Sequence, residues 1–170
     1  MSSGEILGPW AELVVAGLVA GGVRSVVVSP GSRSAPFVLT CLRRAELTCW
    51  SVVDERSAAF FALGQAKATS APVALLSTSG TAPAHYLPAV IEASATGCPL
   101  VLITADRPHE LVHCGAPQTI EQTRLFDGTV RHAVDLGNPD SRVAALRGAY
   151  RRVEQAVSLA LGPRPGPVHV

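Results

Sequence analysis

The 170-residue sequence has little charge, few aromatic residues and no closely spaced pair of cysteines. Charged residues make up 16% of the chain and aromatic residues 5%, and the formal net charge is only +1. This balance excludes the strongly basic surface that nucleic-acid binding needs, and the 48% of hydrophobic residues excludes a disordered chain. We therefore expect a folded protein whose partner is a small molecule, with no nucleic acid bound.

The sequence also lacks an apolar run long enough to cross a membrane. The apolar stretch 13–20 is much shorter than the roughly 20 residues that a spanning helix needs, and Glu12 directly precedes it. No basic segment stands before it, as a secretion signal requires. We expect a soluble, cytoplasmic protein that contacts no membrane.

No C-x-x-C spacing occurs among the four cysteines, Cys41, Cys49, Cys98 and Cys114. Most of them lie in apolar surroundings, which is typical of buried, reduced thiols. Cys114 follows His113 in a polar loop, so a nucleophilic role for this thiol is an alternative.

Helix-like and strand-like patterns alternate along the chain, which predicts βαβ units and a parallel sheet covered on both faces. The strand-like runs are continuously apolar, as in strands buried on both faces. The expected strands are 25–29, 47–53, 73–76, 99–105, 129–136 and 166–170. The expected helices are one that ends at 21–22, then 35–44, 55–68, 81–95 with a kink at Pro88, and one that begins at Pro139. The predicted fold class is α/β, with three layers (α/β/α), a six-stranded mainly parallel sheet, and a single domain over residues 1–170.

Two further features concern the second half of the chain. The polar segment 106–128 is long enough to be a functional loop. In the last helix, apolar side chains at helical spacing are expected to face inward: Val143, Leu146, Tyr150, Val153 and Val157. The chain ends inside a strand-like run, so we expect it to be a fragment of a longer protein.

Polar residues at three strand-to-helix junctions suggest a site. The junctions are Ser29-Pro30-Gly31-Ser32-Arg33-Ser34, Asp54-Glu55, and Ser77-Thr78-Ser79-Gly80-Thr81. Ligands of open parallel sheets bind beyond the carboxyl ends of the strands, so the three junctions are expected to converge on one pocket.

Glu55 is the candidate for proton chemistry, because it is a carboxylate where a strand meets a helix. An acid in the first turn also stabilises the helix dipole, and that structural role is the alternative. Asp54 is a natural N-cap, which leaves Glu55 free to point into the pocket.

Ser32 and Arg33 present hydroxyl, backbone and guanidinium donors near a helix N-terminus, which suits a carboxylate or a phosphate. A helix cap beside a surface arginine would have the same sequence. Gly80 permits the close approach of a flat ring, although turns use glycine in the same way.

The segment His109-Glu110-Leu111-Val112-His113 matches H-E-x-x-H, the zinc-hydrolase pattern. The pattern works only on a helix, and Pro108 and Gly115 leave little room for one. We expect no metal site in the chain, and a zinc hydrolase is an alternative that metal analysis would test.

Taken together and in this order, five segments resemble the amino-terminal part of the 2-succinyl-5-enolpyruvyl-6-hydroxy-3-cyclohexene-1-carboxylate (SEPHCHC) synthases. The segments are 29–34, 54–61, 77–81, 104–108 and 114–119, and the resemblance covers essentially the whole chain. This family belongs to the thiamine-diphosphate enzymes, and the matching part is their pyrimidine-binding domain. The family decarboxylates 2-oxoglutarate on thiamine diphosphate and adds the succinyl unit to isochorismate in menaquinone biosynthesis.

The resemblance implies a role for each candidate residue. Glu55 corresponds to the carboxylate that hydrogen-bonds the aminopyrimidine ring and promotes ylide formation on the cofactor. Four residues correspond to substrate-side positions, where arginine suits the carboxylates of both substrates: Ser32, Arg33, Arg107 and Gln118. The residues expected to border the pyrimidine ring beside Glu55 are Thr78, Gly80 and Thr81.

The sequence departs from the family at His109 and Pro117, where proline and asparagine are common, so the contacts beside Gln118 stay open. It also lacks the Gly-Asp-Gly motif that holds the diphosphate and Mg²⁺. The resemblance therefore implies central and diphosphate-binding domains outside this chain.

In the family the pocket forms between the pyrimidine-binding domain of one subunit and the diphosphate-binding domain of another, in a homodimer or homotetramer. The chain alone is thus expected to fold but to be inactive. The alternative function is a non-enzymatic α/β module that binds small anions.

Overall fold

The computed structural model describes residues 3–170, with side chains from residue 6 onward. Within this range six parallel strands form one sheet, in the order β2-β1-β3-β4-β6-β5. The strands are β1 (Ser25–Val28), β2 (Thr48–Ser51), β3 (Val73–Ser77), β4 (Leu100–Thr104), β5 (His132–Ala133) and β6 (Val168–His169). The predicted α/β class and six-stranded sheet are confirmed, and every pairing in the sheet is parallel.

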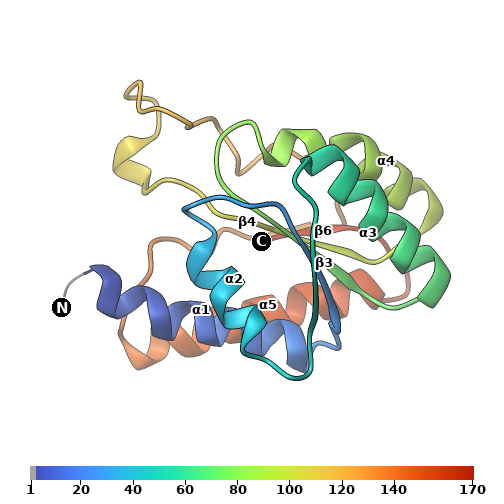
Figure 1. The fold of residues 1–170 in the computed structure, drawn as a ribbon, viewed down its shortest axis with the longest axis horizontal. Helices are drawn as coiled ribbons and strands as arrows, with labels where there is room; N and C mark the ends of the chain where they lie inside the picture. The colour runs from blue at the N-terminus through green and yellow to red at the C-terminus, as the bar shows by residue number, and fades with distance from the viewer. Residues whose placement is uncertain (1–2) are drawn as a thin grey trace.

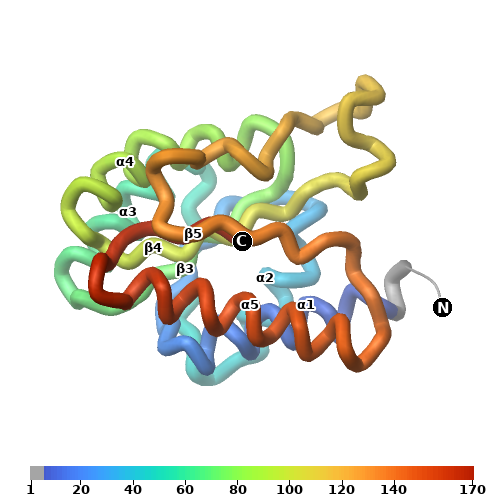
Figure 2. The backbone as a smooth tube through the Cα atoms, turned by 180° about the vertical axis from the view of Figure 1, so that it is seen from behind, coloured from blue at the N-terminus to red at the C-terminus, as the bar shows by residue number. Residues whose placement is uncertain are grey.

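Helices cover both faces of the sheet (Figures 1 and 2). One face carries α1 (Ser3–Ala20), α2 (Ala35–Leu42) and α5 (Val143–Leu161), and the other carries α3 (Glu55–Thr69) and α4 (Leu87–Thr96). α1 and α5 pack closely because Gly17 lacks a side chain: a Cβ there would lie 2.7 Å from the carbonyl oxygen of Tyr150. The three-layer α/β/α arrangement is therefore confirmed.

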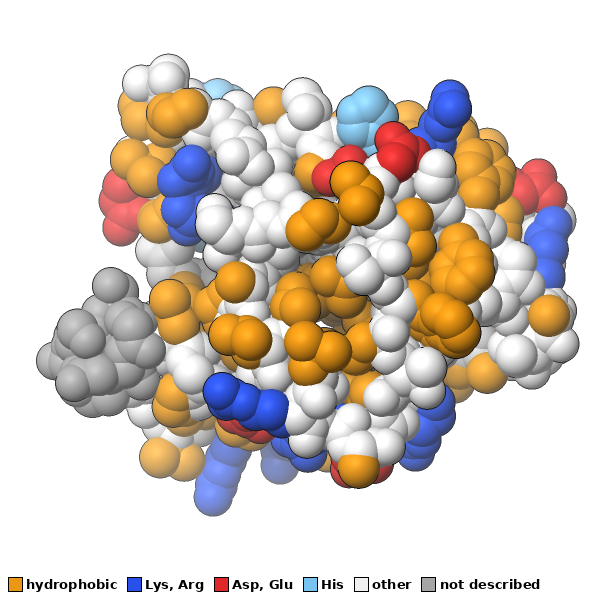
Figure 3. Space-filling model, viewed as in Figure 1, with side chains coloured by type: hydrophobic (Ala, Val, Ile, Leu, Met, Phe, Trp, Pro, Cys, Tyr) orange, Lys and Arg blue, Asp and Glu red, His pale blue; other side chains and the backbone are white. Residues whose placement is uncertain are grey.

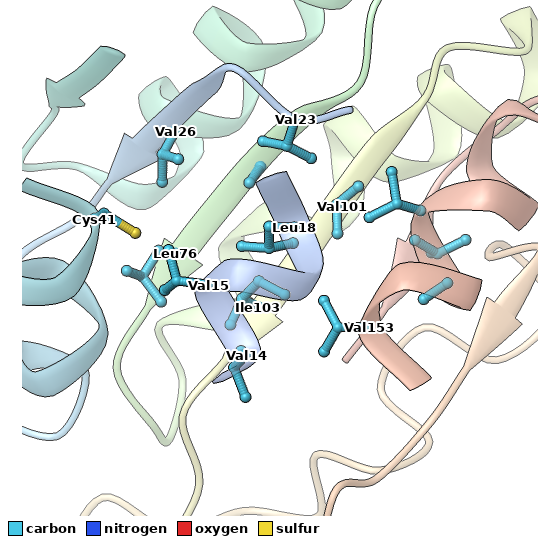
Figure 4. Packing of buried hydrophobic residues seen from close by; sticks show 14 of the residues in the cluster. Val14, Val15, Leu18, Val23, Val26, Cys41, Leu76, Val101, Ile103 and Val153 are labelled. Atoms are coloured by element: carbon cyan, nitrogen blue, oxygen red, sulfur yellow. The ribbon is translucent and has the colours of Figure 1, made fainter. Parts of the chain in front are cut away.

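The central strands are buried on both faces, as their continuous apolar runs predict. In β3, Leu75 packs against α3 and α4, while the next residue, Leu76, packs against α1. Figure 4 shows Val15 of α1 beside Leu76, with Leu18 further along the same helix. Both faces of the sheet thus contribute to the core.

β2 does not fit this prediction, because it is the edge strand of the sheet. Trp50 is 44% exposed, and Thr48 and Ser51 are exposed as well. The ring of Trp50 instead makes an edge-to-face contact with Phe61 of α3, with 5.5 Å between the ring centroids. The apolar side chain of Trp50 on this strand therefore lies on a partly exposed surface rather than in the core.

Several predicted elements are shorter than expected, among them one helix and one edge strand. The helix expected over 81–95 is a 3-10 helix, η1 (Pro83–Tyr86), followed by α4. Pro88 stands in the first turn of α4, where its missing N–H has no partner to lose, so it starts the helix rather than kinking it. Of the strand expected over 129–136, only β5 joins the sheet.

The last helix begins at Val143 rather than at Pro139, and this corrects one predicted inward residue. Val143 is 63% exposed at the first position of α5, whereas Val153 and Val157 are fully buried. The carboxylate of Asp140 accepts a hydrogen bond from the backbone N–H of Arg142 at 2.8 Å, which holds residues 140–142 in a turn before the helix starts.

The structure agrees with the predicted state of most thiols. Cys41 and Cys98 are buried, Cys49 is partly buried, and all three are free. Burial raises the pKa of Cys41 to about 12, which makes that thiol unreactive. Cys114 is exposed and donates to the carbonyl oxygen of Leu111 at 3.1 Å. Among the helices of the described range, none is long and apolar enough to span a membrane.

Candidate functional site

The loops that follow β1, β3 and β4 meet at the carboxyl edge of the sheet. The backbone N–H of Ser29 donates to Leu76, and that of Ala105 donates to Ser77, at 3.0 and 3.1 Å. The loops also touch through Gly31, where a Cβ would lie 2.3 Å from the Cβ of Thr78. Of the three junctions predicted to converge, those after β1 and β3 therefore meet, and the loop after β4 joins them.

A cavity of about 820 Å³ lies beyond these strand ends. One part of its wall is apolar and includes Trp10, Val14 and Phe37. The cavity also brings together most of the predicted polar residues: Ser32, Arg33, Thr78, Arg107 and Gln118. On the face seen in Figure 3, hydrophobic side chains gather near the centre of the molecule. The apolar wall and the two arginines suit a ligand with an apolar body and a negatively charged group.

Arg33 and Arg107 are the two arginines of the cavity wall. Burial lowers the pKa of Arg33, and the nearby Arg107 lowers it further, while Asp106 opposes both. Arg107 donates through Nη2 to the carbonyl oxygen of Pro117 at 3.1 Å. Its Nε is buried and has no hydrogen-bond partner within the described chain. An anion that accepts from this nitrogen would relieve the cost of an unpaired buried donor.

Asp106 is one of three acidic residues of the cavity wall, together with Glu110 and Asp135. Its Oδ1 accepts from the backbone N–H of Arg107 at 2.6 Å, and burial raises the pKa of its carboxyl group. The carboxylate therefore moderates the mutual repulsion of the two arginines without occupying either guanidinium in an ion pair of the described residues.

Ser32 and Arg33 do not form the simple helix cap that their sequence also allowed. Ser34 is the N-cap position of α2, but its hydroxyl donates to the carbonyl oxygen of Gly31 at 3.0 Å and makes no capping bond. Arg33 is partly buried and Ser32 is exposed at the cavity wall. Both side chains are therefore available to a ligand.

Gln118 is hydrogen-bonded to the loop after β3. The side-chain Nε2 of Gln118 donates to the backbone carbonyl oxygen of Ser79 at 3.2 Å. The backbone carbonyl oxygen of Gln118 accepts from the Ser79 hydroxyl at 3.0 Å. Its backbone is left-handed, with a φ of 56°. Gly80 packs so closely that a Cβ there would lie 2.8 Å from Cγ of Gln118, and its φ of 82° also requires glycine.

Glu55 lies apart from the cavity wall, at the first position of α3. Asp54 caps the helix as predicted: its Oδ1 accepts from the backbone N–H of Ser57 at 2.8 Å, and this bond lowers the pKa of Asp54. The Glu55 carboxylate is partly buried and makes no hydrogen bond or ion pair with the described side chains. It is therefore free to receive a donor from outside the chain.

Tyr86 lies close to Glu55 and was not singled out from the sequence. It is fully buried, and burial raises its pKa to about 12, with a small contribution from the negative charge of Glu55. The hydroxyls of Tyr86 and Ser77 make no hydrogen bond of good geometry within the described range. A tyrosine inside an apolar helical pattern carries no signal of this position, which only the fold brings near Glu55.

The H-E-x-x-H segment does not form a helix with two imidazoles on one face. Its only regular part is a 3-10 helix, η2 (His109–Leu111), and His113 has a left-handed φ of 62°. His109 lies 3.6 Å from a carboxylate oxygen of Asp135, and His113 lies 3.7 Å from one of Glu121. Across the described residues, no group of three or more potential ligands could hold a metal ion.

The comparisons with known proteins all indicate the same family. Residues 10–125 match the family model described as thiamine pyrophosphate enzyme, N-terminal TPP binding domain. The chain is similar to the 2-succinyl-5-enolpyruvyl-6-hydroxy-3-cyclohexene-1-carboxylate synthase of Sorangium cellulosum (strain So ce56), with 51% identity over 100% of the chain. Synthases of the same name from Dechloromonas aromatica (strain RCB) and Lysinibacillus sphaericus (strain C3-41) are 52% and 49% identical over 95% and 100% of the chain. The chain spans 28%, 30% and 30% of the length of these three relatives.

Proposed function

The chain belongs to the family of N-terminal TPP-binding domains of thiamine pyrophosphate enzymes, and from this premise we propose that it is the pyrimidine-binding domain of a SEPHCHC synthase. The observation that carries the proposal is the 51% identity to such a synthase across all 170 residues. The whole enzyme would be a cytoplasmic transferase of menaquinone biosynthesis. It would decarboxylate 2-oxoglutarate and add the succinyl unit to isochorismate.

The free carboxylate of Glu55 fits thiamine diphosphate, because it is a partly buried acceptor at a strand end with no partner in the described chain. Bound there, the cofactor supplies the electron sink for decarboxylation of a 2-oxo acid. Glu55 would hold a proton between its carboxylate and a ring nitrogen of the cofactor. Thr78, Gly80 and Thr81 would border the ring, and Mg²⁺ and the diphosphate would be held by a domain outside this chain.

The substrates would be bound by the cavity. Both 2-oxoglutarate and isochorismate carry two carboxylates, and the planar guanidinium of arginine binds such groups through paired hydrogen bonds. Arg33 and Arg107 would bind the carboxylates, with the buried Nε of Arg107 as one donor. Ser32 and Gln118 would orient the bound molecule.

An exposed apolar surface beside Glu55 supports a site completed by a second subunit. The surface comprises Trp50, Val53, Phe60 and Phe61, which are 44%, 79%, 47% and 40% exposed. Figure 3 shows hydrophobic side chains gathered over α3. The diphosphate-binding domain of another subunit would cover this surface and exclude water from Glu55, in a homodimer or homotetramer.

Replacement of Glu55 tests the proposed function. In the full-length enzyme, Glu55→Gln should abolish carboligation and leave the fold unchanged, because the amide cannot hold the proton that a carboxylate holds. Glu46→Gln, at an exposed position, is the matched control and should retain full activity. Substantial turnover by Glu55→Gln would refute the assigned role.

Calorimetric titration with thiamine diphosphate tests the divided site. The 170-residue chain should bind the cofactor weakly or not at all, and binding should appear when the diphosphate-binding domain is added. Tight cofactor binding by the chain alone would contradict the divided site. Binding of small dicarboxylates with no effect of the cofactor would favour the anion-binding module instead.

A further inference from the structure

We propose that Gln122 is a positioning residue: its buried amide joins the ends of β3 and β4 and thereby fixes Gln118 in the substrate cavity. The kinetic part of this inference rests on the proposed function, whereas the structural part does not. Gln122 belongs to the polar loop 106–128, and nothing in the local sequence separates it from other polar residues there.

The burial of Gln122 is unusual for its loop. The side chain is only 3% exposed, although its neighbours Glu121 and Thr123 are both exposed. An amide is costly to bury unless its hydrogen bonds are made. This amide makes bonds with both of its polar atoms, so it is held in one orientation.

The bonds of Gln122 link two strand ends. Its Oε1 accepts from the backbone N–H of Gly80, after β3, at 2.7 Å. Its Nε2 donates to the carbonyl oxygen of Ala105, after β4, at 3.2 Å and lies 3.5 Å from the Thr104 hydroxyl. A single side chain therefore bridges the two loops that carry Thr78 and Arg107, beyond the last backbone hydrogen bond between β3 and β4.

The Gly80 end of this link reaches Gln118 directly. A Cβ on Gly80 would meet Cγ and the backbone carbonyl group of Gln118, and the adjacent Ser79 exchanges two hydrogen bonds with Gln118. Arg107 in turn donates to the carbonyl oxygen of Pro117, the residue before Gln118. If Gly80 loses its partner, the backbone against which Gln118 packs is free to shift.

The network also extends to β6. The Thr104 hydroxyl lies 2.8 Å from Nε2 of His169, a buried imidazole whose pKa is lowered to about 4 by desolvation. His169 therefore stays neutral near pH 7, and protonation of this ring does not disturb the network in that range. Other titratable or charged groups lie in the loop or beside it: Asp106, Arg107, His109, Glu110, His113, Cys114, Glu121, Arg124, Asp127 and Asp135.

The first test measures the structural link in the 170-residue chain, by amide hydrogen exchange read by NMR. In Gln122→Ala the Gly80 N–H should exchange roughly tenfold or more faster than in the unmodified chain, since a buried donor has lost its acceptor. Gln155→Ala, at an exposed position of α5, should leave this rate unchanged. Equal protection of Gly80 in Gln122→Ala would overturn the proposal whatever the activity of the enzyme.

The second test uses a double-mutant cycle in the full-length enzyme. Gln122→Ala should raise the KM for 2-oxoglutarate roughly tenfold, with kcat within about twofold of the original, since substrate placement rather than the chemical step is lost. If Gln122 acts through Gln118, the double variant with Gln118→Ala should be no worse than the poorer single variant. Additive losses would show that Gln122 does not act through Gln118.

Gln122→Glu provides the conservative rescue and remains informative if the alanine variant folds poorly. The introduced carboxyl group, when ionised, could accept from Gly80 but could not donate to Ala105, whereas in its protonated form it could do both. Burial raises the pKa of such a carboxyl group, so the KM defect should shrink as the pH falls from about 8 to about 6. The original enzyme, measured at each pH, corrects for Asp106 and the neighbouring groups. A defect that does not depend on pH would contradict the role of the donated hydrogen bond.

Discussion

Gly31 lies directly against the side chain of Thr78, and this contact joins the loop after β1 to the loop after β3. A Cβ on Gly31 would lie 2.3 Å from Cβ of Thr78 and 2.7 Å from its methyl group. Thr78 is short and buried, so it has little freedom to move aside. The distance between the two loops, and with it the position of Ser32 and Arg33, therefore depends on the absence of a side chain at residue 31.

Gly31→Ala should lower the free energy of unfolding by about 2 kcal/mol, because the added methyl group overlaps Thr78 and forces the loops apart. Gly64→Ala is the control. Gly64 is exposed on α3 with no atom near its Cβ position, and alanine there should stabilise the helix by about 0.5–1 kcal/mol. Urea unfolding of both variants measures the difference, and equal stability of the two would contradict the contact.

His169 should make the protein sensitive to acid. The imidazole is buried, and its pKa is lowered to about 4 from an ordinary value of 6.5. The unfolded chain therefore binds a proton between these values while the folded chain does not. The contribution of neutral His169 to the free energy of unfolding is fully present above pH 6.5. It should be lost on acidification towards pH 4, which lowers the free energy of unfolding by up to about 3 kcal/mol.

His169→Gln should remove most of this acid sensitivity, since glutamine does not titrate but can still hydrogen-bond the Thr104 hydroxyl. The measurement is the difference in unfolding free energy between pH 7 and pH 4.5. His85→Gln, at an exposed position, should leave that difference unchanged. If His169→Gln is as acid-sensitive as the original chain, the carboxyl groups and not His169 are responsible.

Arg131 ties α4 to the segment before β6. Its guanidinium donates to the hydroxyl and carbonyl of Ser94 at 2.9 and 2.6 Å and to the carbonyls of Arg164 and Pro165 at 3.2 and 3.1 Å. Arg131→Met keeps much of the side-chain volume but leaves these acceptors unpaired. We expect a loss of about 2 kcal/mol in thermal or urea unfolding.

The control for Arg131 is Arg147→Met, on the exposed face of α5, which should change stability by less than about 0.5 kcal/mol. Similar effects of the two substitutions would mean that the bonds of Arg131 contribute nothing beyond a surface charge.

Arg107→Lys should weaken the proposed binding of dicarboxylates in the full-length enzyme, because lysine keeps the charge but loses the planar fork. We expect the KM for 2-oxoglutarate to rise roughly tenfold or more, which corresponds to the loss of about one charge-assisted hydrogen bond. Arg147→Lys is the control for an arginine-to-lysine substitution at an exposed position, and it should leave the KM unchanged. An unchanged KM in Arg107→Lys would remove this residue from the substrate site.

The sequence predicted the central part of the fold well, and the edges less well. β1, β3 and β4 are continuous apolar runs buried on both faces, and such runs have few alternative structures. Trp50 and Val143 are apolar but exposed, because Trp50 lies on an edge strand and Val143 lies at the start of a helix. Local hydrophobicity does not distinguish a core residue from one on a partly open surface.

The polar residues show the same division. The strand-to-helix junctions alone placed Ser32, Arg33 and Thr78 at one edge of the sheet, because parallel strands end on the same side. The sequence could not show that Glu55 lies outside the cavity wall, nor that Gln122 is buried at 3% exposure. Hydrogen bonds decide the second point, and the partner of Gln122 at Gly80 is 42 positions away along the chain.

By itself, then, the sequence determined the alternation of strands and helices, the class of fold and the polar junctions, since each depends on neighbouring residues. Only the tertiary structure decided which polar groups share a wall, which are left without partners and which are buried. Those properties depend on atoms brought together from distant segments, as the unpaired Nε of Arg107 and the amide of Gln122 both illustrate.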